Sequence, residues 1–289
     1  MEPNKLRSIR LRLDQNHYHI ENFTFSGGEV HVDLSYLPTL CHDYSIKARL
    51  QSGDDIMNFI MMCDAVHNRY PKATGTVVIP YLPYARQDRV CAEGQHFGLH
   101  AVAKVLGTIP QSHLVIYDPH SGVAVPQLKL DKKFTKVSVY EQQHIIERCQ
   151  TLKNKIQEGQ LQLVSPDFGA QGKTHKVHQI LKSPLEVIHA TKTRNPQTGW
   201  LETDELNIDL NGQDVLILDD ICDGGATFLG LAKELKRCNA GRVVLYVTHG
   251  IFSKGVKTLY DGGIDHIYTT DSFDYDKTIA PARLTRIKL

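Results

Sequence analysis

The sequence of 289 residues lacks long apolar runs and an excess of either charge. No segment approaches the roughly 18 consecutive apolar residues that a membrane-spanning helix needs. Residues 1–5 lead into alternating Arg and Leu instead of the apolar core of a secretory signal. The 33 Lys and Arg residues nearly balance the 32 Asp and Glu residues, whereas a nucleic-acid-binding domain usually carries a basic excess. We therefore expect a cytoplasmic protein that engages neither a membrane nor nucleic acid.

Closely spaced cysteine pairs are also missing. The six cysteines stand far apart and form no C-x-x-C pair of the kind that binds zinc or performs redox chemistry (Cys41, Cys63, Cys91, Cys149, Cys222 and Cys238). The 15 histidines show no H-E-x-x-H spacing. Six reduced thiols in an intracellular enzyme are the simplest interpretation.

What the sequence does contain is a regular alternation of apolar β-branched runs with segments of helical period. Strands are predicted at residues 76–80, 114–117, 161–164, 185–189, 215–218 and 243–247, and helices at residues 98–106, 175–181 and 227–237. Strands that alternate with helices of this length form parallel βαβ units, so we expect an α/β fold. A polar stretch at residues 142–159 predicts two halves, residues 1–145 and 146–289, and residues 191–205 are predicted to form a mobile loop.

Residues 215–227 form the most informative segment. An apolar strand delivers two adjacent carboxylates, Asp219 and Asp220, and a short turn then leads to a helix (Asp223, Gly224, Gly225, Ala226 and Thr227). Glycines let backbone N–H groups approach an anion closely, and a helix N-terminus adds positive potential, so a phosphate fits this turn. Carboxylates at the end of such a strand suit the vicinal hydroxyls of a sugar, with or without a divalent cation.

The motif D-D-x-x-[DS]-x-x-x-T resembles the phosphoribosyl-diphosphate loop of the type I phosphoribosyltransferase fold. Other motifs, in the same order along the chain, narrow the resemblance to the ribose-phosphate pyrophosphokinases. Residues 80–89, Pro-Tyr-Leu-Pro-Tyr-Ala-Arg-Gln-Asp-Arg, are similar to the family's ATP-binding signature. Residues 164–169, Val-Ser-Pro-Asp-Phe-Gly, and residues 248–253, Thr-His-Gly-Ile-Phe-Ser, resemble two further family motifs. The resemblance implies two similar phosphoribosyltransferase-like, Rossmann-like halves with mainly parallel sheets.

The resemblance also implies substrates and an activity. ATP would give its β,γ-pyrophosphoryl group to the 1-hydroxyl of ribose 5-phosphate, which yields phosphoribosyl diphosphate and AMP. The N-terminal half, residues 1–145, would bind ATP through a set of matched positions (Phe25, Gly27, Glu29, Arg86, Gln87 and Asp88). The C-terminal half, residues 146–289, would bind ribose 5-phosphate through the loop at residues 219–227. Packing of its last residues on the N-terminal half is an open alternative.

The remaining roles are carried over in the same way. Lys192 and Arg194 match a K-x-R pair described as catalytic, and alternate cations on a movable loop suit charge neutralisation in a transition state. His120 and Asp167 match residues that contact Mg²⁺ in the family, with Mn²⁺ as a second possible metal. Relatives act as oligomers, and we expect at least a dimer here.

Some positions differ from the family pattern, and they leave other functions open. Gly27 stands where relatives carry Asp or Asn, and Gly224 and Ala226 stand where the sugar-phosphate loop usually reads D-T-x-G-T. The altered loop would tolerate a larger ribose 5-phosphate ester, such as ADP-ribose, as the acceptor of the same pyrophosphoryl group. A non-catalytic regulatory protein that associates with a synthetase is a further alternative, and so is a phosphoribosyltransferase.

Overall fold

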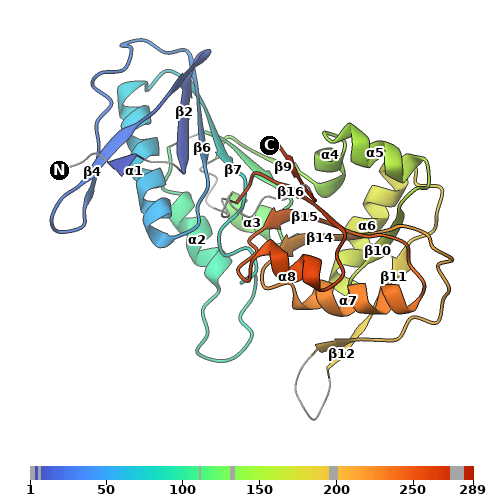
Figure 1. Cartoon of the computed structure of the whole chain (residues 1–289). Coiled ribbons are helices and arrows are strands. Elements are labelled where there is room, and N and C mark those ends of the chain that lie inside the picture. Colours follow the sequence, from blue (N-terminus) through green and yellow to red (C-terminus); the bar gives the residue numbers. More distant parts are fainter. Residues whose placement is uncertain (1–3, 6–7, 111, 131–133, 195–200, 274–282) are drawn as a thin grey trace. The chain divides into compact units, whose positions relative to one another are not determined.

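A computed structural model of the chain describes residues 4–5, 8–110, 112–130, 134–194, 201–273 and 283–289 (Figure 1). The chain divides into two compact units, Met1–Tyr140 and Glu141–Leu289. The polar stretch in which we predicted the boundary belongs to the second unit, where it forms helices α4 (Gln142–Ile146) and α5 (Gln150–Gln157). Although the stretch is polar overall, each helix has an apolar side chain that anchors it: Ile146 in α4 and Ile156 in α5 are fully buried.

The first unit is built on a six-stranded sheet in the order β3-β2-β6-β7-β8-β9. Strands β6 to β9 run parallel to one another, and β2 pairs antiparallel with both β3 and β6. The strands are β2 (Ile9–Leu13), β3 (Asn16–Tyr18), β6 (Asp43–Ala48), β7 (Thr74–Ile79), β8 (His113–Tyr117) and β9 (Lys136–Tyr140). A separate antiparallel sheet has the order β1-β4-β5 and consists of β1 (Asn4–Lys5), β4 (Glu21–Thr24) and β5 (Val30–Val32).

Helices α1 (Gly53–Arg69), α2 (Gly98–Leu106) and α3 (Ala124–Lys129) complete the first unit. Ser52 is the N-cap of α1, and its hydroxyl oxygen accepts a hydrogen bond from the Asp55 backbone N–H. Two acidic residues in the first turn interact favourably with the positive end of the helix dipole. Its apolar face, which includes Phe59, Met62 and Val66, joins a core formed with the strands.

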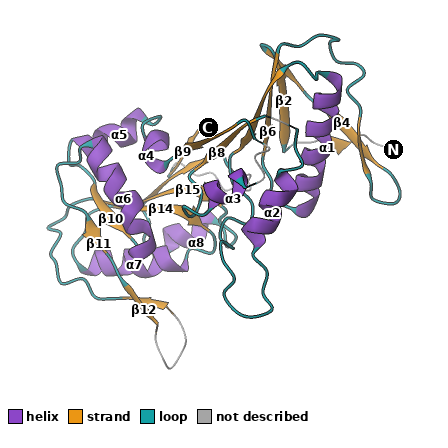
Figure 2. Ribbon diagram, turned by 180° about the vertical axis from the view of Figure 1, so that it is seen from behind, coloured by secondary structure: helices purple, strands orange, loops and turns teal. Residues whose placement is uncertain are grey.

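The second unit contains a six-stranded, wholly parallel sheet in the order β11-β10-β14-β15-β16-β17. Figure 2 labels β11, β10, β14 and β15 of this sheet. Its strands are β10 (Gln162–Ser165), β11 (Ile188–His189), β14 (Val215–Cys222), β15 (Val243–Gly250), β16 (His266–Thr270) and β17 (Leu284–Ile287). Helices α6 (Phe168–Leu181), α7 (Ala226–Arg237) and α8 (Val256–Asp261) connect them. Strand β15 is buried at every position, as expected of a strand covered on both faces.

The α/β fold predicted from the alternation of strands and helices is confirmed. Each predicted strand and helix overlaps one in the structure, and three details of the structure go beyond the predictions. Strand β14 continues through both acidic residues to Cys222. The predicted loop at residues 191–205 contains a two-stranded antiparallel pair, β12 (Lys192–Arg194) and β13 (Leu201–Thr203). The last strand, β17, belongs to the sheet of the second unit, because it pairs with β16.

The structure also bears on two inferences from composition. All six cysteines are free thiols, and Cys63, Cys222 and Cys238 are buried. Within the described ranges, no helix is both long and apolar enough to cross a membrane.

Candidate functional site

The two adjacent acids of β14 occupy different environments. Asp220 is 4% exposed, and its Oδ2 lies 3.1 Å from Lys173 Nζ, which reaches it from α6. Asp219 is half-buried, and its Oδ1 accepts a hydrogen bond from the Asp220 backbone N–H at 2.8 Å. Burial and the neighbouring negative charge of Asp220 raise the pKa of Asp219 well above the ordinary carboxyl value. The sheet therefore presents one acid paired with a cation and one whose charged form is destabilised.

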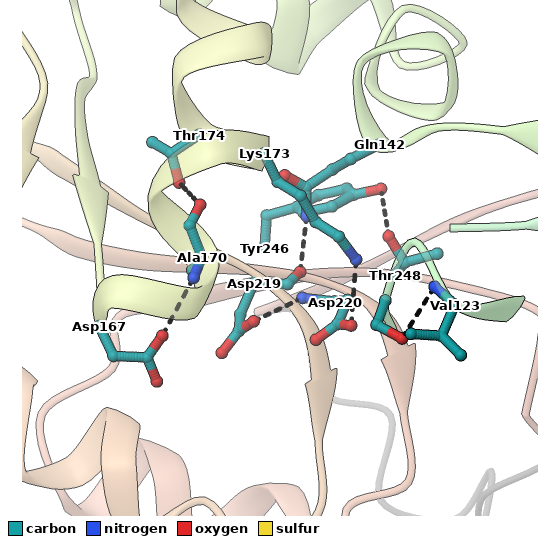
Figure 3. Close-up of polar contacts among 11 residues, drawn as sticks. Val123, Gln142, Asp167, Ala170, Lys173, Thr174, Asp219, Asp220, Tyr246 and Thr248 are labelled. Carbon is teal, nitrogen blue, oxygen red and sulfur yellow. Dashed lines mark hydrogen bonds and ion pairs between the residues drawn. The ribbon is translucent and has the colours of Figure 1, made fainter. Parts of the chain in front are cut away.

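Two residues that the sequence did not single out hold these acids in place (Figure 3). Lys173 lies in α6 and points toward Asp220, and the Gln142 side-chain amide of α4 donates a hydrogen bond of 2.7 Å to the Asp219 backbone carbonyl. Lys173 lies just before the helix predicted at residues 175–181, and the local sequence of neither Lys173 nor Gln142 indicates this role.

Lys192 forms the second cluster of the unit. Its ammonium lies 2.8 Å from Asp167 Oδ2 and 3.1 Å from Thr227 Oγ1, and the side chain is 12% exposed. The other carboxylate oxygen of Asp167 accepts a hydrogen bond from the Ala170 backbone N–H and so caps α6. Three positions predicted to be functional, far apart in the sequence, are thus brought into direct contact. Arg194 has its backbone in β12, and its side chain lies outside the described residues.

The turn between β14 and α7 has the backbone that a phosphate-binding loop needs. Gly225 precedes α7 with a φ of +80°, a left-handed conformation that favours glycine. A β-carbon at this position would also lie 2.6 Å from Leu259 Cδ2 of α8, so the close packing of α8 excludes a side chain. Because α7 starts at Ala226, the first N–H groups of the helix are presented at Gly225, Ala226 and Thr227. The neighbouring Asp223 and Gly224 are half-buried.

The Thr-His-Gly segment at the end of β15 supports this turn from the adjacent strand. Cys222 pairs in register with Gly250, so the turn after β14 and the chain after β15 leave the sheet side by side. Thr248 and His249 are buried, and His249 Nδ1 lies 2.9 Å from Ser272 Oγ. A β-carbon at Gly250 would lie 2.2 Å from the Phe252 ring, which explains the glycine at that position.

In the first unit, the predicted nucleotide segment forms a turn after β7. Tyr84 adopts a φ of +60°, and the Gln87 backbone N–H donates to its carbonyl at 2.9 Å. Gln87 Oε1 lies 2.7 Å from His96 Nε2 and packs on Gly98, where a β-carbon would approach that oxygen to 2.2 Å. Gln87 is therefore fixed against the first residue of α2.

Beside Gln87 in this turn, the Arg86 side chain is exposed and Asp88 is half-buried. An exposed guanidinium on a turn held by backbone hydrogen bonds is suited to bidentate hydrogen bonding with a phosphate. The structure thus presents the cation of the motif to solvent while it fixes the amide that follows.

The predicted adenine-contacting residues share a single hairpin turn between β4 and β5. The Phe25 backbone N–H donates to the Glu29 carbonyl at 2.8 Å, and Gly28 takes a φ of +92°. The Phe25 ring is 48% exposed and stands edge-on to Phe23, with centroids 4.8 Å apart. A β-carbon at Gly27 would lie 3.0 Å from Glu29 Oε2, so an Asp or Asn at this position would require the carboxylate to move.

His120 follows β8 and is exposed, while the preceding Asp118 is buried with a φ of +37°. Of the two predicted metal ligands, His120 belongs to the first unit and Asp167 to the second. Among the residues that the structure describes, no three His, Cys, Asp or Glu side chains are grouped so as to hold a metal ion.

Comparison with known proteins identifies both units. Residues 3–109 match the family model described as the N-terminal domain of ribose phosphate pyrophosphokinase, and residues 138–279 match the phosphoribosyl transferase domain. The chain belongs to the ribose-phosphate pyrophosphokinase family. Its resemblance to this family, inferred from motifs, is confirmed.

The curated relatives of the family carry the name ribose-phosphate pyrophosphokinase. The protein of Pyrococcus abyssi is 30% identical over 196 residues, which cover 68% of this chain and 64% of the relative. That of Pyrococcus furiosus is 29% identical over 75% of this chain and 73% of the relative. Ribose-phosphate pyrophosphokinase 1 of Listeria innocua is 26% identical over 86% of this chain and 75% of the relative. The aligned part of the chain thus spans about two thirds to three quarters of the length of these relatives.

Among solved structures, phosphoribosylpyrophosphate synthetase from Mycobacterium smegmatis matches with a TM-score of 0.77 and 21% sequence identity. The match covers 96% of this chain and 88% of that one, and it shows the fold. The expectation of phosphoribosyltransferase-like halves with mainly parallel sheets is confirmed by this likeness and by the parallel pairing described above.

Proposed function

We propose that this chain transfers the β,γ-pyrophosphoryl group of ATP to the 1-hydroxyl of ribose 5-phosphate, which gives phosphoribosyl diphosphate and AMP. The observation that carries the proposal is the contact of Lys192 with both Asp167 and Thr227. A cation is thereby held beside the turn that binds a sugar phosphate. The family name of the relatives supports the same reaction.

The second unit, close to the predicted range 146–289, would bind the acceptor. The N–H groups of the Gly224, Gly225, Ala226 and Thr227 turn would hold the 5-phosphate, and Asp223 would complete the loop. Asp219 and Asp220 would accept hydrogen bonds from ribose hydroxyls. The ion pair between Asp220 and Lys173 fixes one of these carboxylates before the sugar arrives, so less ordering is needed on binding.

The first unit, close to the predicted range 1–145, would bind ATP. Arg86 would grip a phosphate, Gln87 and Asp88 would contact the nucleoside, and Phe25 would stack on adenine with Gly27 and Glu29 beside it. The exposure of the Phe25 ring and of Arg86 to solvent supports these roles.

Pyrophosphoryl transfer depends mainly on positioning and on neutralising the negative charge of the transferred group. Lys192 would supply positive charge for this purpose, and Arg194, two residues on in the same strand, would supply more. The Asp167 carboxylate keeps the Lys192 ammonium oriented until a phosphate takes its place as the partner.

Mg²⁺ prefers oxygen ligands and usually keeps several waters and substrate phosphates in its shell. As the resemblance implies, His120 of the first unit and Asp167 of the second would be the residues that contact the metal, with Mn²⁺ as a second possible metal. When bound, the ion neutralises the triphosphate and polarises the bond that breaks.

We also propose a cytoplasmic location and an assembly of at least two chains. Six free thiols suit a reducing compartment. Sedimentation of the purified chain would test the assembly.

The reaction is tested by incubating the protein with ATP, Mg²⁺ and ribose 5-phosphate while AMP is followed by chromatography. The proposal expects stoichiometric AMP and phosphoribosyl diphosphate. A parallel incubation with ADP-ribose tests whether a larger ester is the acceptor, and AMP formed only there would replace ribose 5-phosphate in the proposal. If AMP forms with neither acceptor, the regulatory-protein alternative gains support.

A further inference from the structure

A lysine outside the predicted site residues lies along the phosphate-binding turn. A β-carbon at Gly224 would meet the Lys254 side chain at three points, with Cε at 3.5 Å, Cδ at 3.6 Å and Cγ at 3.9 Å. These are ordinary van der Waals distances, so the aliphatic stem runs beside Gly224. The ammonium lies one bond beyond Cε, next to the turn that precedes α7.

The backbone around Lys254 is anchored to the turn itself. The Phe252 backbone N–H donates to the Cys222 carbonyl at 3.1 Å, and the Ser253 N–H donates to the Asp223 carbonyl at 3.2 Å. On the other side, the Thr258 hydroxyl donates to the Lys254 carbonyl at 2.8 Å. The lysine is thus held beside Gly224 by hydrogen bonds to the strand end and to α8, although its side chain is exposed.

The charge of Lys254 has no counterion within the described part of the chain. Lys257, the next lysine along, differs because its Nζ pairs with Asp261 Oδ2 at 2.6 Å. An ammonium without an ion-pair partner, placed against a turn of N–H donors and the N-terminus of a 12-residue helix, increases the positive potential there.

We propose that Lys254 binds the phosphate of the sugar acceptor, as an additional specificity-determining residue of this turn. The inference rests on the proposed function, which places that phosphate at residues 223–227. Gly224 leaves room for the lysine stem and provides no hydroxyl of its own, so a charged donor takes the place of a neutral one. A hydrogen bond from a charged group is stronger than one from a hydroxyl, so the lysine compensates for the missing side chain.

Binding of ribose 5-phosphate by calorimetry tests this role without requiring turnover. Lys254→Met removes the ammonium and keeps an unbranched apolar stem, so the packing on Gly224 is retained. We expect the Kd for ribose 5-phosphate to rise about 10- to 100-fold, the range for loss of one charge-assisted hydrogen bond. Lys257→Met is the matched control, since it removes a nearby exposed lysine that already has a partner, and its Kd should equal that of the unaltered protein. The Kd for ATP should be unchanged in both variants.

Inorganic phosphate serves as a second probe of the same turn. Lys254→Met should bind it more weakly than the unaltered protein does. A Lys254→Met protein that binds both probes as tightly as the unaltered protein overturns the inference. So does an unaltered protein that binds neither probe. Failure of the proposed function is seen separately, as the absence of AMP in the assay above. In that case, weaker binding of ribose 5-phosphate by Lys254→Met would still support the role of the lysine.

Discussion

Lys192 Nζ lies 2.8 Å from Asp167 Oδ2, and this ion pair joins the first residue of β12 to the residue that caps α6. The pair involves a residue predicted to be catalytic and one predicted to bind the metal. Because the lysine side chain is only 12% exposed, it is held in one place more firmly than a surface lysine. The pair therefore links the geometry of the proposed transfer step to the start of α6.

Replacing Lys192 by Ala should lower kcat far more than it raises the KM for ATP, because the proposed role of the lysine is to neutralise charge that develops during transfer. Loss of one such group typically costs about 10²- to 10³-fold in rate. Steady-state assays of AMP release measure both constants, and Lys192→Arg should recover part of the rate. A kcat equal to that of the unaltered protein removes Lys192 from the mechanism.

Replacing Asp219 by Asn should stabilise the protein at high pH and leave stability nearly unchanged at low pH. The folded-state pKa of Asp219 is raised above that of the unfolded chain, which is about 3.9. The folded protein therefore binds this proton more tightly, and its stability falls as the pH rises from the unfolded pKa through the folded one. The asparagine has no charge to bury, so the gain in Tm over the unaltered protein should be larger at pH 8 than at pH 5.

The measurement is thermal unfolding in EDTA at the two pH values. Asp220→Asn provides the contrast, since it breaks the ion pair with Lys173 and leaves a partly buried ammonium without its carboxylate. It should lower the Tm at both pH values. Equal effects of Asp219→Asn at pH 5 and pH 8 would show that this carboxyl titrates normally.

Replacing Gly225 by Ala should destabilise the second unit by about 1–2 kcal/mol through its left-handed backbone alone, and the contact with Leu259 adds to this cost. Binding of ribose 5-phosphate should weaken as well, because the N–H groups of the turn shift. Gly224→Ala is the stability control, since a β-carbon there meets only ordinary contacts. Urea unfolding of the two variants compares them, and equal stabilities would contradict the packing described here.

Replacing Gly98 by Ala should weaken ATP binding while acceptor binding stays unchanged. The new methyl group would displace Gln87 Oε1, which lies 2.2 Å from the β-carbon position, and would break its contact with His96. Gly53→Ala is a suitable control because Gly53 also begins a helix but faces open space. Calorimetry with ATP decides the matter, and an unchanged affinity would argue against a role for Gln87 in the nucleotide site.

Much of this protein follows from local sequence alone. The apolar runs determine where most strands lie, since β-branched segments of this length are buried only in a covered sheet. The motifs around Arg86, Asp167 and Asp219 are contiguous, so each is readable without knowledge of the fold, and together they indicate the family. The glycine at Gly225 also follows from its position before a helix, where a turn needs its backbone freedom.

Tertiary structure alone decided how the charged side chains are partnered. Successive residues of a strand face opposite ways, so Asp219 and Asp220 lie in different environments, and Lys173 of α6 forms its ion pair with Asp220. Lys254 comes to lie beside Gly224 because Cys222 and Gly250 are in register on parallel strands, whose carboxyl ends meet at one edge. The polar stretch after Tyr140 forms two helices because a few of its apolar side chains are buried against the rest of the unit. Local composition does not show that such a buried surface is present.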